Sequence, residues 1–559
     1  MQKQSIIKYF NHKNFNRPVI AFFALYLVIG LLIHRDYGVT WDESVQREHG
    51  KASWDAINDH FDGFFYDKPY FEGEDRKIRS RYGMLFQMVA LQLERTFNIR
   101  GIREPFLLRH LLGFLLFFTA TIFFYKIISQ RTRSWKWGLI GALFLILSPR
   151  IFAHAFFNPK DAITFSLYLI ATYSLLQFVE KRSLKTALTH GFATGILLNA
   201  RLVGLGIPVL TFGVLFWELI VIRSINKYFP KTKIIGNNLS FNDNPIKSWV
   251  MSGVYLVATG FFTFIFWPYL WSNPFGKGVG TLKAFTKYSA WDGQILYWGE
   301  YVRSANLPWH YVPSYMLTTI PLAFGPLFFI GLYFILKKVA QSKGWLYQSK
   351  EGRTDLILLA IFIAPLIAVI ALNANMYDGW RHTFFIYVGF LGIATLGFYH
   401  IWQRRTVKKW IWQVALVLVS LNMVDVTYWM IRYHPLQNAY FNLYAGKNII
   451  YRMEVDYWGQ GYRQLYEILA ELDPSEKIRV QASSYPGWEN FRTLEPELKK
   501  RFVYNWEKKS GGYYLTNYRF EEELNNWKNN TSFYKDPVHI VYIRRTPVLG
   551  IYCLEDHYD

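Results

Sequence analysis

The stretch IAFFALYLVIGLLIHRDYGVTWDE, residues 20–43, begins as an apolar run and ends in two adjacent carboxylates, Asp42 and Glu43. Lys and Arg residues precede the run, as they do in a signal peptide, but no small-x-small cleavage site follows it. We therefore expect an uncleaved membrane-spanning helix over residues 18–34. That helix would deliver the acid pair close to a membrane surface.

Ten further apolar windows follow along the chain, and windows of about 20 apolar residues are typical of spanning helices. The complete set of predicted spans is 18–34, 105–128, 137–153, 161–179, 186–200, 202–222, 249–267, 312–336, 355–373, 382–400 and 410–430. The pattern predicts a polytopic α-helical membrane protein with about 11 transmembrane helices.

The basic clusters orient these spans, because Lys and Arg concentrate in cytoplasmic loops. With the N-terminus inside, every second loop carries such a cluster; KKVAQSKG (337–344) and QRRTVKK (403–409) are examples. An odd number of spans then places the C-terminus outside. We predict a transmembrane domain over 1–430 and an extracytoplasmic soluble α/β domain over 431–559.

Two outer segments show their own secondary structure. The first outer loop, 35–103, contains RYGMLFQMVALQLERTF (81–97), which is amphipathic and too polar to span, so we expect a helix on the membrane surface. The tail mixes a helical pattern, GYRQLYEILAEL (461–472), with strand patterns, KIRVQA (477–482) and VHIVYI (538–543).

Several function classes find little support. The net charge of +22 lies in loops between apolar runs, and no nucleic-acid-binding motif accompanies it, so we expect no nucleic-acid partner. A single cysteine, Cys553, excludes an internal disulfide. The histidines lack metal-ligand spacing, and no GxSxG elbow is present. Charges gather at the outer ends of spans and not at mid-membrane, which favours surface chemistry over transport.

Candidate acids lie at two outer positions. Asp42 and Glu43 follow the first span, and Asp161 follows Pro159 at the start of the fourth. Each has an ordinary explanation, because exposed loop acids are usually solvated and an acid at a helix start is favoured by the helix dipole. A carboxylate at a membrane surface is also a natural general base.

Candidate cations lie at the same predicted face. They are Lys160, Arg201 and Arg381, the last of these in the short turn YDGWRH (377–382) with Tyr377, Asp378 and His382. Arg and Lys at this depth suit a lipid phosphate. The alternatives are snorkelling toward head groups and, for Arg381, simple pairing with Asp378. Trp and Tyr in these loops fit a membrane belt or a platform for sugar rings.

The motifs YGVTWDE, FFNPKDA, LPWHYVPSYMLTTIP, YDGWRH and DYWGQGYRQL together resemble the GT-C superfamily of polytopic membrane glycosyltransferases. The likeness is greatest to the branch that holds protein O-mannosyltransferases and aminoarabinose transferases. The resemblance implies an inverting transfer of sugar from a polyprenyl-phosphate donor to a protein, lipid or glycan acceptor. It also implies the outer face of a bacterial cytoplasmic membrane, surrounded by membrane lipids.

Carried over to this chain, the resemblance implies that Asp42 is the general base, supported by Glu43, with Asp161 as a second acid. Lys160, Arg201, Tyr377, Arg381 and His382 become candidates for the donor phosphate. No DxD element is present, so no metal or other cofactor is invoked. A flippase for lipid-linked sugars and an outer-face glycan polymerase or ligase remain open alternatives.

Overall fold

The computed structural model describes residues 16–62, 83–222, 245–286, 291, 293–342, 349–506, 511–531, 534 and 536–554. Among these residues, seven helices are long and apolar enough to cross a membrane. They are α4 (Glu104–Thr132), α7 (Asp161–Glu180), α11 (Pro245–Ile265), α14 (Phe324–Gln341), α15 (Lys350–Ala371), α17 (Lys409–Arg432) and the continuous pair η8 (Arg381–Ile386) and α16 (Tyr387–Gln403). The chain is therefore a mostly helical, multi-pass membrane protein.

Two predicted spans are wrong as single helices. Residues 137–153 form α5 (Trp135–Ile146) and α6 (Pro149–Phe157), bent by 69°. Residues 312–336 form α13 (Tyr311–Thr319) and then α14. Both breaks precede a proline, which lacks an N–H and disfavours helical geometry in the residue before it. Ser148 and Ile320, the preceding residues, are accordingly extended.

Three other predicted spans are short or interrupted. Helices α1 (Arg17–Ile33) and α8 (Leu184–Ala200) have 17 residues each. Residues 202–222 divide into a 3₁₀ turn η2 (Leu202–Leu205), α9 (Gly206–Phe216) and a π-helical segment η3 (Trp217–Ile222). With the bent pair counted once, the described residues contain up to eight spans, and the predicted number of eleven is not reached.

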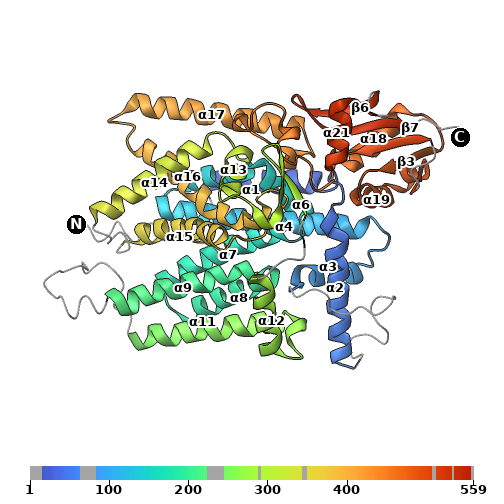
Figure 1. The fold of residues 1–559 in the computed structure, drawn as a ribbon. Coiled ribbons are helices and arrows are strands. Elements are labelled where there is room, and N and C mark those ends of the chain that lie inside the picture. The colour runs from blue at the N-terminus through green and yellow to red at the C-terminus, as the bar shows by residue number, and fades with distance from the viewer. Residues whose placement is uncertain are drawn as a thin grey trace.

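The described part of the loop 35–103 contains two helices, one of which lies within the predicted helical stretch 81–97. Helix α2 (Trp41–His60) runs across the ends of the spanning helices in Figure 1, and α3 (Leu85–Thr96) packs beside it. Further elements between spans are η5 (Pro268–Leu270), α12 (Pro274–Thr286), the antiparallel hairpin β1 (Gln294–Tyr297) and β2 (Glu300–Arg303), and η6 (Ser304–Asn306). These segments form a cap over one end of the bundle.

The C-terminal segments form a five-stranded mixed sheet of order β4-β3-β5-β7-β6. Its strands are β3 (Ile478–Ala482), β4 (Phe502–Tyr504), β5 (Gly512–Thr516), β6 (Pro537–Ile543) and β7 (Thr546–Leu554). Strand β3 pairs in parallel with β4 and β5, and the other pairs are antiparallel. Helices α18 (Tyr462–Leu472), α19 (Tyr485–Arg492), α20 (Pro496–Lys500) and α21 (Glu521–Asn529) accompany it. The predicted helix and both predicted strands of the tail are confirmed.

Short 3₁₀ turns carry the chain from α17 to this sheet; they are η9 (Gln437–Ala439), η10 (Leu443–Ala445) and η11 (Ile449–Tyr451). The sheet lies at the end of the bundle that α2 crosses (Figure 1).

Helix α16 lies at the centre of the bundle, and glycine permits its close packing against α14. A Cβ at Gly397 would lie 2.0 Å from the carbonyl oxygen of Leu327, so a side chain there would force the helices apart. Because α16 continues directly from η8, this packing also fixes the position of Arg381 at the cap end.

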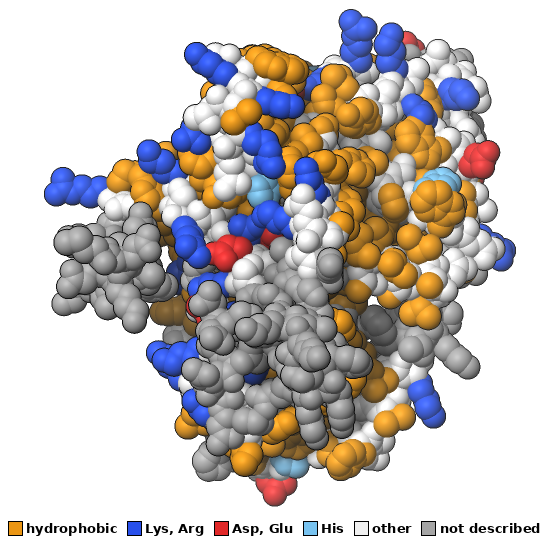
Figure 2. Space-filling view, turned by 90° about the vertical axis from the view of Figure 1, so that its left-hand side faces the viewer, with side chains coloured by type: hydrophobic (Ala, Val, Ile, Leu, Met, Phe, Trp, Pro, Cys, Tyr) orange, Lys and Arg blue, Asp and Glu red, His pale blue; other side chains and the backbone are white. Residues whose placement is uncertain are grey.

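The opposite end of the bundle is basic. Figure 2 shows Lys and Arg side chains around the described part of this face, with few acids among them. Arg404, Arg405 and Lys408 lie exposed between α16 and α17 at this end, and the exposed Lys409 begins α17. The basic N-terminus and most of the 223–247 loop, which were predicted to lie on the same side, fall outside the described residues.

Candidate active site

The acid pair lies at the start of α2, where its two members have different environments. The Glu43 carboxylate accepts hydrogen bonds from the backbone N–H of Thr40 at 2.9 Å and from the Thr40 hydroxyl at 3.1 Å. It also lies 2.9 Å from Nε2 of His110 on α4 and is fully buried. Such a capping arrangement stabilises a helix start. Glu43 therefore holds α2 against α4.

Asp42 points the other way and keeps access to solvent, with 32% of its side chain exposed. Among the described residues, the cation that pairs with it is Arg381, whose Nη1 lies 3.5 Å from Asp42 Oδ2. This carboxylate is thus oriented by a charge while it remains available to another molecule. Asp42 and Glu43 are thus adjacent in sequence but differ in role: Glu43 is buried in a structural contact, and Asp42 remains partly exposed.

Asp161 is the buried centre of the cluster. As the first residue of α7, it accepts hydrogen bonds from Arg201, from Nη1 of Arg381 at 2.8 Å and from the Asn158 side chain at 3.3 Å. Asn158 in turn accepts the backbone N–H of Asp161 at 2.8 Å, which fixes the turn before the helix. A buried carboxylate needs such partners, because an unpaired buried charge is strongly destabilising.

Arg381 connects three acids. Its Nη2 donates to Asp378 at 3.0 Å, while Nη1 contacts both Asp161 and Asp42. The guanidinium carbon lies 4.8 Å from the ring centroids of both Tyr377 and Trp458. Arg381 is buried, so snorkelling does not explain it, and the predicted alternative of pairing with Asp378 is one part of a larger network.

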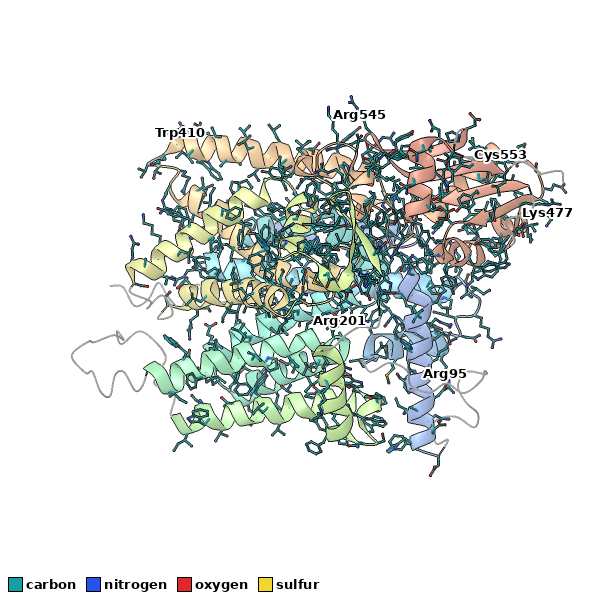
Figure 3. The ribbon with its side chains drawn as sticks, viewed as in Figure 1. Arg95, Arg201, Trp410, Lys477, Arg545 and Cys553 are labelled. Carbon is teal, nitrogen blue, oxygen red and sulfur yellow. The ribbon has the colours of Figure 1, made fainter. Side chains whose placement is uncertain are left out.

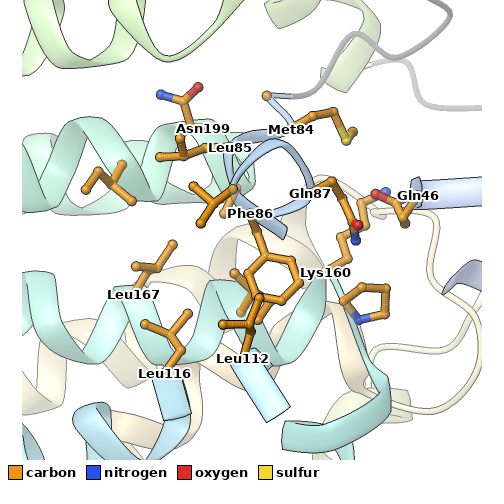
Figure 4. A pocket seen from close by; sticks show the side chains of 16 residues that line it. Gln46, Met84, Leu85, Phe86, Gln87, Leu112, Leu116, Lys160, Leu167 and Asn199 are labelled. Carbon is orange, nitrogen blue, oxygen red and sulfur yellow. The ribbon is translucent and has the colours of Figure 1, made fainter. Parts of the chain in front are cut away.

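Lys160 lies beside this network and also lines a cavity of about 310 Å³. Figure 4 shows the cavity wall, which is mostly apolar and comes from α3, α4, α7 and α8. Labelled members are Leu85, Phe86, Leu112, Leu116 and Leu167. Burial, with a further contribution from Arg201, lowers the pKa of Lys160 to about 8. An apolar cavity with one cation in its wall suits a lipid that carries a negative head group.

Tyr377 and His382 complete the predicted set. The two rings meet edge to face at 4.6 Å between centroids, and Tyr377 is also the ring beneath Arg381. The Nε2 atom of His382 is buried and has no hydrogen-bond partner among the described residues. Every residue predicted from the sequence for the site thus lies in or beside one cluster. Within it, Glu43 has a structural role, because it holds α2 against α4. Figure 3 labels Arg201, which lies where the layer of α8, α9 and α11 faces the rest of the bundle.

Sequence reasoning missed Arg519. This residue follows β5 in the C-terminal sheet, yet its Nη2 donates to Asp378 at 3.0 Å across 141 positions of sequence. Its guanidinium carbon lies 5.4 Å from the ring centroid of Trp41, next to Asp42. Burial and the neighbouring Asp378 raise the pKa of Glu454, another acid beside this group, above its ordinary value. No local motif marks Arg519 or Glu454, because tertiary contact alone brings them here.

No group of three or more His, Cys, Asp and Glu side chains in the described residues could hold a metal ion.

Comparisons with known proteins give structural similarity only. No family model and no curated protein matches the chain. The chain is similar to ArnT from Cupriavidus metallidurans in the apo state, with a TM-score of 0.45, 12% identity and coverage of 95% of this chain and 97% of that one. It is also similar to the oligosaccharyltransferase of Archaeoglobus fulgidus in the apo form, with a TM-score of 0.45, 12% identity and coverage of 86% of this chain.

The chain spans 64% of the length of that archaeal protein. A further similar structure is ArnT from Cupriavidus metallidurans bound to undecaprenyl phosphate, at a TM-score of 0.43 and 11% identity. Both proteins are GT-C glycosyltransferases, the superfamily that the sequence motifs resemble. All these TM-scores lie below 0.5, and the function proposed below therefore rests on the side chains of this chain.

Proposed function

We propose that the protein is an inverting membrane glycosyltransferase that moves a sugar from a polyprenyl-phosphate donor to a hydroxyl of a protein, lipid or glycan acceptor. One observation carries the proposal. A partly exposed carboxylate, Asp42, and two arginines that share the buried Asp161 meet beside an apolar cavity with Lys160 in its wall.

The two acids take different parts in the proposed reaction. Asp42 is the general base, because it alone of the two keeps solvent access, and the described ion pair that it forms with Arg381 is long, at 3.5 Å. It removes the proton of the acceptor hydroxyl as the oxygen attacks the anomeric carbon. Asp161 is occupied by Arg201 and Arg381 and positions these cations.

The cations act on the leaving group. As the bond between the anomeric carbon and the phosphate oxygen breaks, its electron pair moves to that oxygen. Arg201, Arg381 and Lys160 then stabilise the phosphate, and cations fixed in place before the reaction are effective in this role. The apolar cavity next to Lys160 holds the first part of the polyprenyl chain. Tyr377 and His382 border the same place and support Arg381.

The arrangement of the whole chain extends the proposal. We place the basic end of the bundle, with Arg404 to Lys409, inside the cell, and the cap with the C-terminal sheet outside, in the bacterial cytoplasmic membrane. The transmembrane catalytic domain comprises 1–430 and the extracytoplasmic domain 431–559. Arg519 gives the second domain a contact with the site of the first.

The test is transfer in sealed proteoliposomes. Purified protein is reconstituted with undecaprenyl phosphate that carries radiolabelled sugars, together with extracts of envelope protein, lipid and glycan. New labelled acceptor supports an enzyme, and its loss in Asp42→Asn supports the assigned base. Transbilayer movement of the donor without new product would overturn the proposal in favour of a flippase. Transfer of an oligosaccharide from a pyrophosphate donor would favour the polymerase or ligase.

A further inference from the structure

A second cavity, of about 420 Å³, lies at the N-terminal end of α14, away from the acid and cation cluster. Its lining comes from the β1–β2 hairpin, α13, α14 and the η10 turn. Residues that line it include Trp298, Ser314, Leu317, Thr318, Phe329 and Tyr444. Most of these side chains are apolar, so the cavity suits a hydrocarbon more than a sugar.

Trp298 is held at this cavity in an unusual backbone conformation. It is the first residue of a two-residue turn between paired Tyr297 and Glu300, with φ of 52°, and Gly299 follows with φ of 92°. This combination is a type I′ turn, in which a bulky residue at the first position is rare. Residues in the left-handed region persist where surrounding contacts fix them, and they cluster at ligand-binding sites.

Two contacts fix the Trp298 ring. Its Nε1 donates to the Ser314 hydroxyl at 2.8 Å, and the guanidinium carbon of Arg452 lies 4.1 Å from the ring centroid. Arg452 also donates to the carbonyl of Ala445, which closes the η10 turn. The chain thus places a cation beside an aromatic wall of the cavity.

The opposite wall is equally well fixed. Asn442 donates to the carbonyls of Leu317 at 2.6 Å and Ile320 at 2.7 Å, so the turn that carries Tyr444 is tied to the end of α13. Leu443, Tyr444 and Lys447 nevertheless remain exposed. An exposed tyrosine next to lysine and arginine is typical of the level of lipid head groups.

The cavity is continuous with the membrane-facing surface of α14. Phe329 is 59% exposed on this spanning helix and also lines the cavity. An apolar cavity of about 150 Å³ accommodates benzene, and this one has nearly three times that volume. A lipid chain that lies along α14 can therefore enter the cavity without crossing a polar barrier.

We propose that this cavity binds one acyl chain of an anionic phospholipid, whose phosphate lies at Arg452 and Lys447. Helix α13 separates the bound lipid from the catalytic cluster, because Ser314, Leu317 and Thr318 face the cavity while Tyr315 packs against Gly379 in the turn that carries Arg381. The proposal is independent of the transferase activity.

The test uses vesicles of phosphatidylglycerol with a diazirine on one acyl chain, and the purified full-length protein. After photolysis, mass spectrometry locates the label. We expect labelling within residues 314–329 and a loss of at least about tenfold in Gly325→Leu. A Cβ at Gly325 would lie 3.7 Å from Leu317, so the backbone tolerates the side chain, which then fills the cavity.

Gly253→Leu on α11 is the matched control, because a Cβ there meets nothing within 4 Å, and its labelling of 314–329 should equal that of the wild type. Arg452→Gln should remove the preference for phosphatidylglycerol over phosphatidylcholine with the same probe. Equal labelling of 314–329 in the wild type and Gly325→Leu would overturn the acyl-chain site. Equal labelling by the two lipids in the wild type would overturn the assigned anionic head group.

Discussion

Replacement of Asp161 by asparagine should destabilise the protein far more than the same replacement at Asp42. Asparagine keeps the shape of Asp161 but removes the charge that Arg201 and Arg381 share. Loss of one partner of a buried ion pair costs roughly 3–5 kcal/mol. Arg381 keeps Asp378 at 3.0 Å, so we expect the lower end, about 3 kcal/mol.

The matched variant, Asp42→Asn, removes a carboxylate that is one-third exposed and 3.5 Å from its cation. Pairs of this kind contribute about 0–1 kcal/mol. The free energy of unfolding of each variant is measured by titration with SDS in mixed micelles. A double variant with Arg201→Gln should recover part of the loss, with a coupling energy of about 1 kcal/mol or more. Equal stability of the two single variants would refute the assignment of Asp161 as the buried centre.

Three further predictions concern function. Asp42→Asn should lower the turnover number by roughly 10²–10⁴-fold with little change in KM, whereas Asp59→Asn on the same helix should not; a variant at Asp42 with near-normal turnover would remove it as the base. Binding of undecaprenyl phosphate should weaken as pH rises through about 8, because Lys160 loses its proton there, and Lys160→Met should bind weakly without this pH dependence. Isothermal titration calorimetry from pH 6.5 to 9.5 measures the affinity of the wild type and of Lys160→Met. The same pH dependence of affinity in Lys160→Met would contradict the role of Lys160 in binding the phosphate. Leu116→Trp narrows the cavity and should lower the same affinity about tenfold, the effect of losing two buried methylenes at about 0.8 kcal/mol each; unchanged affinity would exclude this cavity as the polyprenyl site.

Most spanning helices were predictable because apolar composition reports directly on burial in lipid. Composition does not report whether such a run is straight. The runs 137–153 and 312–336 are each predominantly apolar, yet Pro149 and Pro321 divide them. The prolines were visible in the sequence, but a proline can also occur inside a continuous helix, as Pro365 does in α15. Only packing decides between these outcomes.

The candidate site was predictable to the extent that its residues lie at the ends of spans. Lys160, Asp161, Arg201 and Arg381 all adjoin such ends, and helices that cross one membrane bring their ends to common levels. The different roles of Asp42 and Glu43 were not predictable, because they depend on His110 reaching Glu43 from another helix. Arg519 was beyond prediction for the same reason.

The chain of contacts from Arg201 through Asp161, Arg381 and Asp378 to Arg519 has a consequence for biosynthesis. A ribosome synthesises Asp161 early and Arg519 late. Asp378 is therefore made well before Arg519, the last cation of this cluster. In a nascent chain that stops before residue 519, Asp378 lacks Arg519. Of the cations in the described residues that pair with Asp378, Arg381 alone is then present. The network therefore closes only after synthesis has passed Arg519, which follows strand β5 of the C-terminal sheet.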